Sequence, residues 1–416
     1  MDIMALAGRY ADDTVEIRRR LHRNPELSDR EFQTLEYIGM KLTEYGVEHI
    51  EVERGGILGF IGRGDVSVLL RADIDALPIR ENPRNLIRER TVISQNDGVQ
   101  HACGHDAHTA MLLTAARILK ENEDVLGGRV VLLFERGEEG KGNLRYLLRH
   151  IIDNGIGVSA AHAIHVRPDL DAGKVYIPRG PIMAGAAGFR VTLRGLGGHG
   201  SRPDLANNPV DCFVAAYNAL TALRLRLVSP FEPFSFSVGL LSGGEKENII
   251  PPELTFGGSA RYYSMAVGEE FAAAFDRILK GVAATYGCEY DSGGILLGSP
   301  TINHDGLADL ARAAALRHLG ADILADREPL MGSESFSVIA RLWPSVMVHL
   351  GVKNDELGAG AGLHSEYFDL DEAALQTGVA ETVAFASEYL KSSTVLTLSE
   401  LCDADEAINW LSKVNL

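Results

Sequence analysis

Short apolar runs alternate with amphipathic helical stretches in the first part of the chain, and this alternation constrains the fold more than any other feature. Apolar runs lie at residues 57–61, 66–70, 130–134 and 160–164, and helical stretches at residues 107–120 and 144–152. Strands that alternate with helices form a sheet covered by helices. We therefore expect an α/β domain, preceded by two amphipathic helices between Val15 and Tyr45.

The pattern changes after Gly180-Pro181, where Phe189, Val191 and Leu193 alternate like a half-exposed strand. The segments that follow read as a helix, two strands, a helix and a strand, at residues 209–226, 234–241, 254–262, 269–286 and near 289. This βαββαβ order is the split-βαβ arrangement. We expect an inserted domain at residues 187–298. The main domain then comprises residues 1–186 and 299–416, with a helix at 302–319, a buried strand at 346–352 and a short helix in the tail from Ser392.

Charge and cysteine content limit the kinds of binding partner and the cellular compartment that we expect for this chain. The formal net charge of −17 is spread along the chain and disfavours nucleic acid and anionic lipid. No apolar run approaches the ~20 residues that cross a bilayer. The four cysteines are too few and too scattered for a disulfide framework, which suits a reducing compartment. We expect a cytoplasmic protein with a small-molecule partner and no nucleic-acid or membrane partner.

The segment His101-Ala102-Cys103-Gly104-His105-Asp106-Ala107-His108 packs a thiol, three imidazoles and a carboxylate in front of a predicted helix. Thiolate and imidazole are preferred ligands of zinc-like ions. A closed structural zinc site is the alternative, but such a site would require further cysteines at short spacing. The segment therefore favours a catalytic metal site.

Two further segments place carboxylates after apolar strands. Asp73 and Asp75 follow one strand, and Glu138 and Glu139 follow another. Ligand sites of open α/β sheets lie at the carboxyl ends of the strands. In each pair one acid can bind metal, while the other orients a ligand histidine or accepts a proton from water. Strand-end capping and a solvated acidic face are the alternatives.

His162 and His165 follow another predicted strand, and His364 follows the last glycine-rich loop. A single histidine of this kind is more often structural than a ligand. However, all five segments fall at predicted strand ends, where one sheet can bring them together. The sequence therefore predicts metal-assisted hydrolysis at this edge of the sheet.

At these residues the sequence resembles the metallo-amidohydrolases grouped as peptidase family M20, which include aminoacylases, hippurate hydrolases, indole-acetyl-amino-acid hydrolases and related carboxypeptidases. The resemblance spans about residues 15 to 390 and includes further motifs: Arg19-Arg20-Leu21-His22, Pro25-Glu26-Leu27, Gly197-Gly198-His199, Asn248-Ile249-Ile250-Pro251, Arg261 and Gly332-Ser333-Glu334. It implies a zinc-peptidase-like α/β catalytic domain that carries a ferredoxin-like lid, through which subunits form a homodimer or homotetramer.

The matching positions imply the metal ligands Cys103, His105, Glu139, His165 and His364. They imply one or two divalent ions, Mn²⁺ or Zn²⁺, with two ions ~3.5–4 Å apart in such sites. The resemblance assigns Glu138 as the general base. It also implies that the lid residues His199, Asn248 and Arg261 bind the substrate carboxylate or polarise the group under attack. In this arrangement His199 comes from a neighbouring subunit.

The sequence also departs from the family pattern around the site. Arg136-Gly137 replaces the usual Pro-Ala, Ser335 stands where an Asp is usual, Ala187 replaces an acid and Glu366 replaces a Pro. We expect hydrolysis of a C–N bond in a small carboxylate-bearing molecule such as an N-acyl amino acid. The departures keep two alternatives open, which are hydrolytic deamination of an aminoaromatic acid such as 5-nitroanthranilate and a non-catalytic binding relative.

Overall fold

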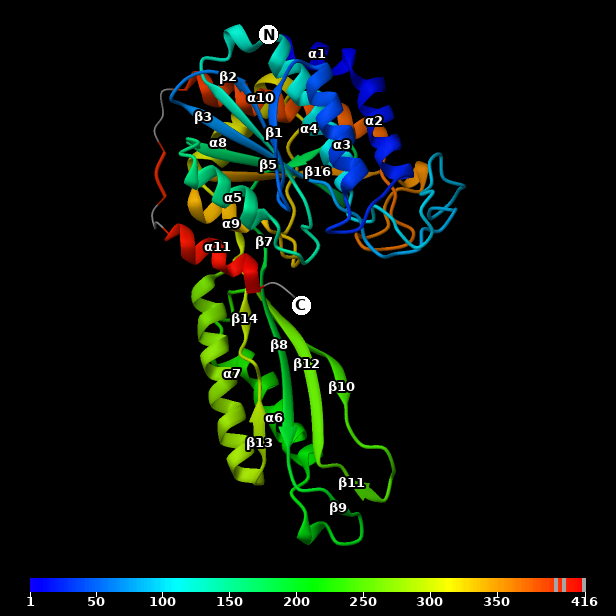
Figure 1. The fold of residues 1–416 in the computed structure, drawn as a ribbon, viewed down its shortest axis with the longest axis vertical. Coiled ribbons are helices and arrows are strands. Elements are labelled where there is room, and N and C mark those ends of the chain that lie inside the picture. The colour runs from blue at the N-terminus through cyan, green and yellow to red at the C-terminus, as the bar shows by residue number, and fades with distance from the viewer. Residues whose placement is uncertain (393–395, 399–401, 414–416) are drawn as a thin grey trace. The chain divides into compact units, whose positions relative to one another are not determined.

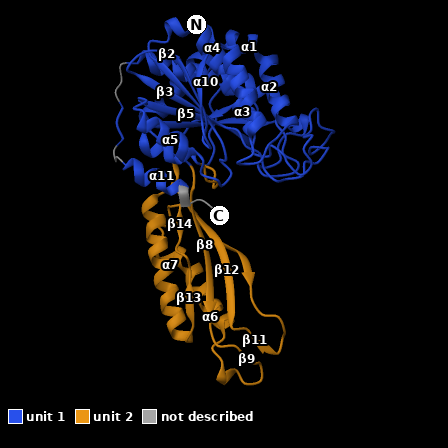
Figure 2. Ribbon diagram, in the orientation of Figure 1, with its two compact units in different colours: residues 1–182, 302–328, 335–415 blue, residues 183–301, 329–334, 416 orange. Residues whose placement is uncertain are grey.

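The computed structural model describes residues 1–392, 396–398 and 402–413, and the chain divides into two compact units (Figure 2). Unit 1 comprises Met1–Ile182, Ile302–Glu328 and the described residues from Ser335 onward. Unit 2 comprises Met183–Thr301 and Pro329–Glu334. The expected insert of residues 187–298 lies within unit 2, which also includes a short segment from later in the chain.

Unit 1 is built on a seven-stranded mixed sheet of order β1-β2-β4-β3-β5-β16-β6. Its strands are β1 Glu48–Val52, β2 Gly56–Gly62, β3 Ser67–Asp73, β4 Arg129–Glu135, β5 Ala160–Asp171, β6 Val175–Tyr176 and β16 Ser345–Lys353. The four central strands β4, β3, β5 and β16 run parallel, whereas the pairings of β1, β2 and β6 are antiparallel. The parallel strands are almost fully buried, because helices cover both faces of such a sheet.

Helices pack on both faces of this sheet (Figure 1). The helices of unit 1 are α1 Ile3–Arg9, α2 Ala11–Arg23, α3 Phe32–Glu44, α4 His105–Glu121, α5 Leu144–Asp153, α8 Asp305–Leu319, α9 Phe336–Leu342, α10 Leu375–Lys391 and α11 Ala404–Lys413, with one-turn helices η1 Glu123–Val125, η3 Asp355–Leu357 and η4 Glu372–Ala374. Helix α4 lies centrally, in contact with α2, α10 and β3. Its buried apolar side chains, such as Met111 and Leu113, fix the start of the helix against the sheet.

Unit 2 is built on a five-stranded antiparallel sheet, in which β10-β12-β8-β13 lie in this order and β14 also pairs with β8. Its elements are β8 Gly185–Arg194, α6 Pro209–Arg226, β10 Phe234–Ser242, β12 Glu253–Tyr262, α7 Met265–Tyr286, β13 Glu289–Asp291 and β14 Leu296–Leu297. Phenylalanines from the sheet and from α7, including Phe189, Phe256, Phe271 and Phe275, pack in its core. A two-stranded ribbon, β9 Gly198–His199 with β11 Ile249–Ile250, and the one-turn helix η2 Pro203–Leu205 complete it.

The α/β fold class is confirmed, and most elements begin and end near the expected residues. The helix expected from residue 302 is wrong at its start, because Thr301–Asn303 forms strand β15 and α8 begins only at Asp305. Helix α1 and the short strand β7 Gly180–Met183 were not expected. The tail helix α11 packs against α5 and α9. Among the described residues, no helix is long and apolar enough to span a membrane.

Candidate metal centre and active site

The expected metal ligands come from one edge of the unit 1 sheet and from the start of one helix. Strand β4 ends at Glu135 just before Glu138 and Glu139, β5 carries His165, and α4 begins at His105. The expectation that all five segments lie at strand ends is therefore wrong for residues 101–108, which lead into α4 and form its first turn, and for His162 and His165, which lie within β5.

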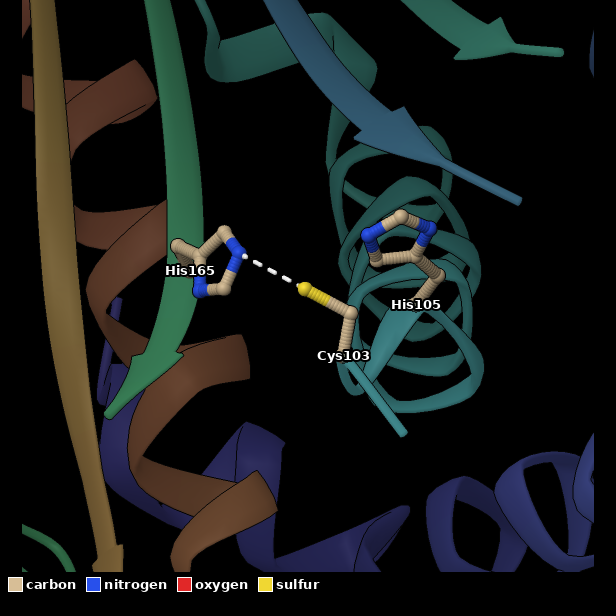
Figure 3. Close-up of side chains that lie close together, drawn as sticks. All are labelled: Cys103, His105 and His165. Carbon is tan, nitrogen blue, oxygen red and sulfur yellow. Dashed lines mark hydrogen bonds between the residues drawn. The ribbon is translucent and has the colours of Figure 1, made fainter. Parts of the chain in front are cut away.

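All five expected ligand residues come together. Cys103 Sγ lies 3.6 Å from His165 Nε2, with His105 beside it (Figure 3). Ligand atoms lie within 4.8 Å of one another in three overlapping groups: Cys103, His105 and His165; Cys103, Glu139 and His364; and His105, Glu138 and Glu139. The thiol and the carboxylates thus link the three histidines into one cluster.

The donor atoms of this cluster fit a cation. His105 Nε2 and Glu139 Oε1 are buried without a hydrogen-bond partner among the described residues. They lie 3.9 Å apart, and Glu139 Oε1 lies 3.2 Å from His364 Nε2. Buried polar atoms are normally satisfied, so two such atoms that face each other in a sulfur, nitrogen and oxygen donor set indicate a metal site.

Asp75 holds two of the ligands in place from behind. It is buried, and its carboxylate accepts hydrogen bonds from His105 Nδ1 at 3.2 Å, from Ser28 Oγ at 2.6 Å, and from the backbone N–H groups of Glu138 and Glu139 at 3.2 and 3.1 Å. Because Nδ1 donates to Asp75, the His105 lone pair lies on Nε2, which faces the cluster. A carboxylate behind a ligand histidine fixes its tautomer and ring orientation.

Asp73 performs a different task from Asp75. Its carboxylate accepts from His108 Nδ1 at 2.6 Å and forms an ion pair with Arg71 at 2.8 Å. His108 Nε2 accepts the backbone N–H of Val166 at 2.9 Å, so both ring nitrogens of His108 are engaged. Asp73, His105 and His108 do lie within 4.8 Å of one another. However, His108 has no lone pair left for a metal, and its role is to join α4 to β5.

Helix α4 and strand β5 approach each other closely at the third ligand. His165 Nδ1 donates to the carbonyl of Val166 at 2.8 Å, which leaves the Nε2 lone pair facing Cys103. Gly104, in front of α4, has φ +87°, and a Cβ there would lie 2.4 Å from Val166 Cγ2. A side chain at this position would therefore push apart the two segments that carry Cys103 and His165.

Burial shifts the proton affinities of the ligands in opposite directions. It raises the pKa of the Cys103 thiol well above its usual range. Burial, together with the nearby His108, lowers the pKa of His165 well below its usual range. Burial also acts to lower the pKa of His105, but the Asp73 carboxylate and Cys103 outweigh it and the net pKa is raised. A cation that replaces protons in this cluster resolves these opposing preferences.

His364 differs from the other ligands in its backbone and exposure. Its φ of +60° is rare for a residue with a side chain, and its backbone N–H donates to the carbonyl of Ala102 at 2.9 Å. That hydrogen bond joins the loop of His364 to the segment that carries Cys103. The side chain is 52% exposed, so this ligand lies on the open side of the cluster. Strained backbone of this kind concentrates at functional sites.

Glu138 lies beside the cluster, with a second loop in contact with it. Its carboxylate belongs to the group formed with His105 and Glu139. Glu138 Oε1 accepts the backbone N–H of Ser335 at 3.0 Å. A carboxylate adjacent to a metal centre and oriented by a backbone donor has the position that a general base requires.

Two of the four expected departures from the family pattern, at Arg136 and Ser335, form buried polar contacts in unit 1. Arg136 forms a buried ion pair with Glu31 at 2.9 Å. Ser335 Oγ donates to Glu135 at 2.7 Å and accepts from Arg71 at 2.8 Å, and Arg71 forms an ion pair with Glu135 at 2.7 Å. A carboxylate on β4 thus lies beside Ser335, the position at which the resemblance predicts an Asp.

The other two departures are also packed within their own units. Glu366 Oε2 accepts from Asn82 Nδ2 at 3.0 Å. Arg90, whose side chain is buried, donates to the carbonyls of Glu366 and Phe368 and so fastens the loop that follows His364. Ala187 is fully buried in unit 2, in register with Ala260.

Sequence reasoning missed Glu31 and a buried charge network behind α4. Asp106 is bound by Arg18 and His22, both at 2.8 Å, and His22 also bonds Glu81 at 2.8 Å. These residues hold the first turn of α4 against α2. The presence of His22 in a quoted motif was the available signal, but nothing in its spacing identifies its partners.

The expected lid residues belong to unit 2 and lie at two ends of it. His199 and Asn248 are exposed neighbours at the β9–β11 ribbon, where Gly200 N–H donates to the Asn248 carbonyl at 2.8 Å. Arg261 lies near the far end of β12 and donates to Ser333 Oγ at 2.9 Å. Eight residues of strand separate Glu253 from Arg261, roughly 26 Å at ~3.3 Å per residue. Within one chain, a small substrate therefore cannot contact both ends of unit 2.

Sequence comparisons place the chain among hydrolases and peptidases, in agreement with a metal site of this composition. The chain matches the model of Peptidase family M20/M25/M40 over residues 69–388. It is 33% identical to IAA-amino acid hydrolase ILR1-like 4 of Arabidopsis thaliana, over 97% of this chain and 91% of the relative. It is 31% identical to N-acetyl-L-cysteine deacetylase of Bacillus subtilis, over 86% and 84% of the two chains. Thermostable carboxypeptidase 2 of Saccharolobus solfataricus is 31% identical, over 91% and 95%.

Solved structures show the same fold. A protein of methicillin-resistant Staphylococcus aureus, described as an aminohydrolase, superposes with a TM-score of 0.84 at 30% identity and covers 94% of this chain and 100% of its own. A Bacillus subtilis protein, described as a dinuclear metal-binding peptidase from the M20 family, superposes with a TM-score of 0.76 at 26% identity, over 91% and 98%.

Proposed function

The chain belongs to peptidase family M20/M25/M40, and from this membership and its site we propose that it hydrolyses the amide bond of N-acyl amino acids or similar amino-acid conjugates. The observation that carries the proposal is the meeting of Cys103, His105, Glu139, His165 and His364 in one cluster, with the Glu138 carboxylate beside it. The enzyme class, a metal-dependent C–N hydrolase, follows from the family. The substrate class does not follow from the family alone and is the part that we propose.

The five clustered side chains form the binding site for one or two divalent ions, for which we propose Mn²⁺ or Zn²⁺. Thiolate, imidazole and carboxylate donors suit either ion. When bound there, such ions polarise the scissile carbonyl and lower the pKa of a water molecule toward ~7. Asp75 keeps His105 Nε2 directed at this site, and the Val166 carbonyl does the same for His165.

Glu138 acts as the general base. Its carboxylate takes a proton from the attacking water and then delivers that proton to the departing amine nitrogen. The Ser335 N–H on Oε1 fixes the direction of the carboxylate. The loop from Arg136 to Gly140 is buried at its start and fastened by Glu31 and Asp75, so the base is held near its working position.

The choice of an amino-acid conjugate rests on three similar relatives. IAA-amino acid hydrolase, N-acetyl-L-cysteine deacetylase and the carboxypeptidase all bear names that describe removal of an amino acid or of its acyl group. The departures at Arg136, Ser335 and Glu366 are accommodated by neighbouring residues, as described above. Arg261 is the cation that we assign to the substrate carboxylate, because a guanidinium binds carboxylates with charge-assisted hydrogen bonds.

We assign His199 and Asn248 to the site of a second copy of the chain. They lie at the end of unit 2 opposite Arg261, so they cannot contact the same small substrate as Arg261 within one chain. Ser201 N–H donates to His199 Nδ1 at 3.1 Å, which places the ring proton on the exposed Nε2. An N–H donor of this kind can polarise a carbonyl oxygen. The proposed assembly is a homodimer or homotetramer formed through unit 2.

Product analysis tests the substrate class. The purified protein, supplied with Mn²⁺ or Zn²⁺, is incubated with N-acetyl, N-benzoyl and N-indoleacetyl amino acids and, separately, with 5-nitroanthranilate. The proposal predicts release of the free amino acid from the conjugates. Ammonium release from 5-nitroanthranilate alone would establish the deaminase alternative. Metal binding without turnover of any substrate would establish a binding relative.

A further inference from the structure

The loop that carries Glu138 follows β4, and its first residues are bound by Glu31, which lies far away in the sequence. Glu31, which precedes α3, is fully buried. Its Oε1 accepts the backbone N–H of Gly137 at 2.8 Å, and its Oε2 accepts Arg136 Nε at 2.9 Å. Both groups that Glu31 binds lie directly before the Glu138-Glu139 pair.

The next two N–H groups of the loop continue this arrangement. Glu138 N–H and Glu139 N–H donate to the two oxygens of Asp75 at 3.2 and 3.1 Å. Three successive backbone donors therefore face two buried carboxylates, which fixes the path of the loop and the direction in which Glu138 leaves it. Gly137 has φ +65°, and a Cβ there would lie 2.7 Å from Asn143 Nδ2, so this path requires glycine at position 137.

The charge on Glu31 is costly, which indicates a role other than stability. Burial and the nearby Asp75 carboxylate both disfavour a second anion at this place. Arg136 compensates with its ion pair, and its guanidinium also lies 5.2 Å from the ring centroid of Phe32. A buried ion pair is often no more stable than well-packed apolar residues, although it fixes geometry. Arg136 is also one of the positions at which this chain departs from its family.

We propose that Glu31 and Arg136 are positioning residues for the general base, and that their ion pair fixes the Arg136–Gly140 loop so that Glu138 is aligned for proton transfer. The proposal rests on the proposed function, because it takes Glu138 as the base. It extends the site to a pair of residues that are neither assigned metal ligands nor the assigned base.

The test uses the metal-loaded protein at pH 8, four single variants and the double variant Glu31→Gln/Arg136→Met. Glu31→Gln removes the charge but keeps one acceptor, Arg136→Met removes the cation, and Arg136→Lys keeps a cation in nearly the same place. Glu381→Gln is the matched control, because Glu381 is a buried carboxylate on α10 that bonds His162 at 2.8 Å and does not contact the loop. For each variant kcat, KM, metal content and backbone hydrogen exchange of the peptide spanning residues 136–143 are measured.

The proposal predicts that Glu31→Gln and Arg136→Met each lower kcat by about 10-fold to 100-fold, with KM and metal content close to those of the wild type. Hydrogen exchange in the loop rises in both variants. Arg136→Lys restores most of the activity, because it restores the ion pair. The double variant is no slower than the slower single variant, since the two residues act as a unit.

Unchanged kcat in Glu31→Gln and Arg136→Met overturns the proposal, as does an equal loss of kcat in Glu381→Gln. Loss of metal content that accounts for the loss of kcat also overturns it. If the wild type turns over no substrate, the proposed function fails instead, and hydrogen exchange then decides about the loop. Raised exchange in Glu31→Gln, but not in Glu381→Gln, supports the positioning role, and unchanged exchange overturns it.

Discussion

The metal cluster of unit 1 and the β9–β11 ribbon of unit 2 both carry predicted site histidines, yet they hold them differently. His105 and His165 are no more than 3% exposed, and each has its Nδ1 fixed by a buried acceptor. His199 is exposed, and its ring is bonded only by Ser201, two residues further along, among the described residues. The cluster is organised by its own chain, whereas the ribbon has only local support.

This difference shows which part of the chemistry one chain can organise alone. Hydrogen bonds to buried acceptors already order the ligand side chains, so little further side-chain entropy is lost when an ion binds to the cluster. Exposed side chains lose freedom only when something binds to them. We therefore expect changes in the cluster to affect metal binding and the chemical step, and changes in the ribbon to depend on a second copy of the chain.

The largest effect is expected for Glu138→Gln, which keeps the shape of the side chain but removes the base. We expect kcat to fall about 10³-fold, within the ~10²–10⁴-fold range of general acid–base catalysis. Metal content, measured by mass spectrometry, should stay unchanged, because Glu138 is not among the assigned ligands. Equal kcat for this variant and the wild type would show that another group takes the proton.

The buried carboxyl group of Glu31 in unit 1 should make the free energy of unfolding depend on pH. Burial, with Asp75 nearby, raises the pKa of Glu31 from 4.5 to about 7. The folded state therefore binds more protons than the unfolded state between these values, and stability falls as the pH rises through them. From pH 5 to pH 8 the wild type should lose about 3 kcal/mol of unfolding free energy more than Glu31→Gln. Denaturant titrations that give the same difference at both pH values would contradict this.

Asp75→Asn tests how far the cluster depends on the residues behind it. The amide cannot accept from His105 Nδ1 and from both loop N–H groups as the carboxylate does, so the ligands lose their orientation. We expect metal affinity to fall about 10–100-fold, measured by competition with a chelator. His199→Gln is the control and should keep wild-type affinity. An equal loss in both variants would remove the distinction between the two regions.

The ribbon can be tested by mixing two impaired variants. His199→Ala keeps the base, and Glu138→Gln keeps the ribbon. If the ribbon of one copy serves the site of another, random dimers of the two should recover about a quarter of wild-type activity, because half are mixed and each of these has one complete site. Native mass spectrometry verifies that mixed dimers form. Mixed dimers with no more activity than the separate variants would place His199 outside the reaction.

The sequence was sufficient for the fold class, and the reasons are local, whereas the five residues that cluster were named together only through the resemblance to the M20 hydrolases. Strand and helix periods locate elements such as β3, β4 and α6, and the end of a parallel strand predicts where Glu138 and Glu139 gather. What remained hidden depends on contacts between distant segments. Glu31 lies 105 residues from Arg136, in a stretch that reads only as the start of a helix.

His108 gives the same lesson at shorter range. In the sequence it looks as good a ligand as His105, because both lie in the same eight-residue segment. The structure separates them through the backbone N–H of Val166, which binds His108 Nε2, and through Asp75, which directs His105 Nε2 at the cluster. Spacing along the chain predicts where a ring lies, but only its partners decide which nitrogen is available.

The most direct test of the central claim is a crystal structure of the protein grown with Mn²⁺, with anomalous diffraction used to locate the metal. We expect one or two ions bound by Cys103 Sγ, His105 Nε2, His165 Nε2, His364 and the Glu139 carboxylate, at about 2.0–2.4 Å from nitrogen and oxygen donors. Absence of anomalous density at this cluster under saturating Mn²⁺ and Zn²⁺, or ions bound only elsewhere, would contradict the account.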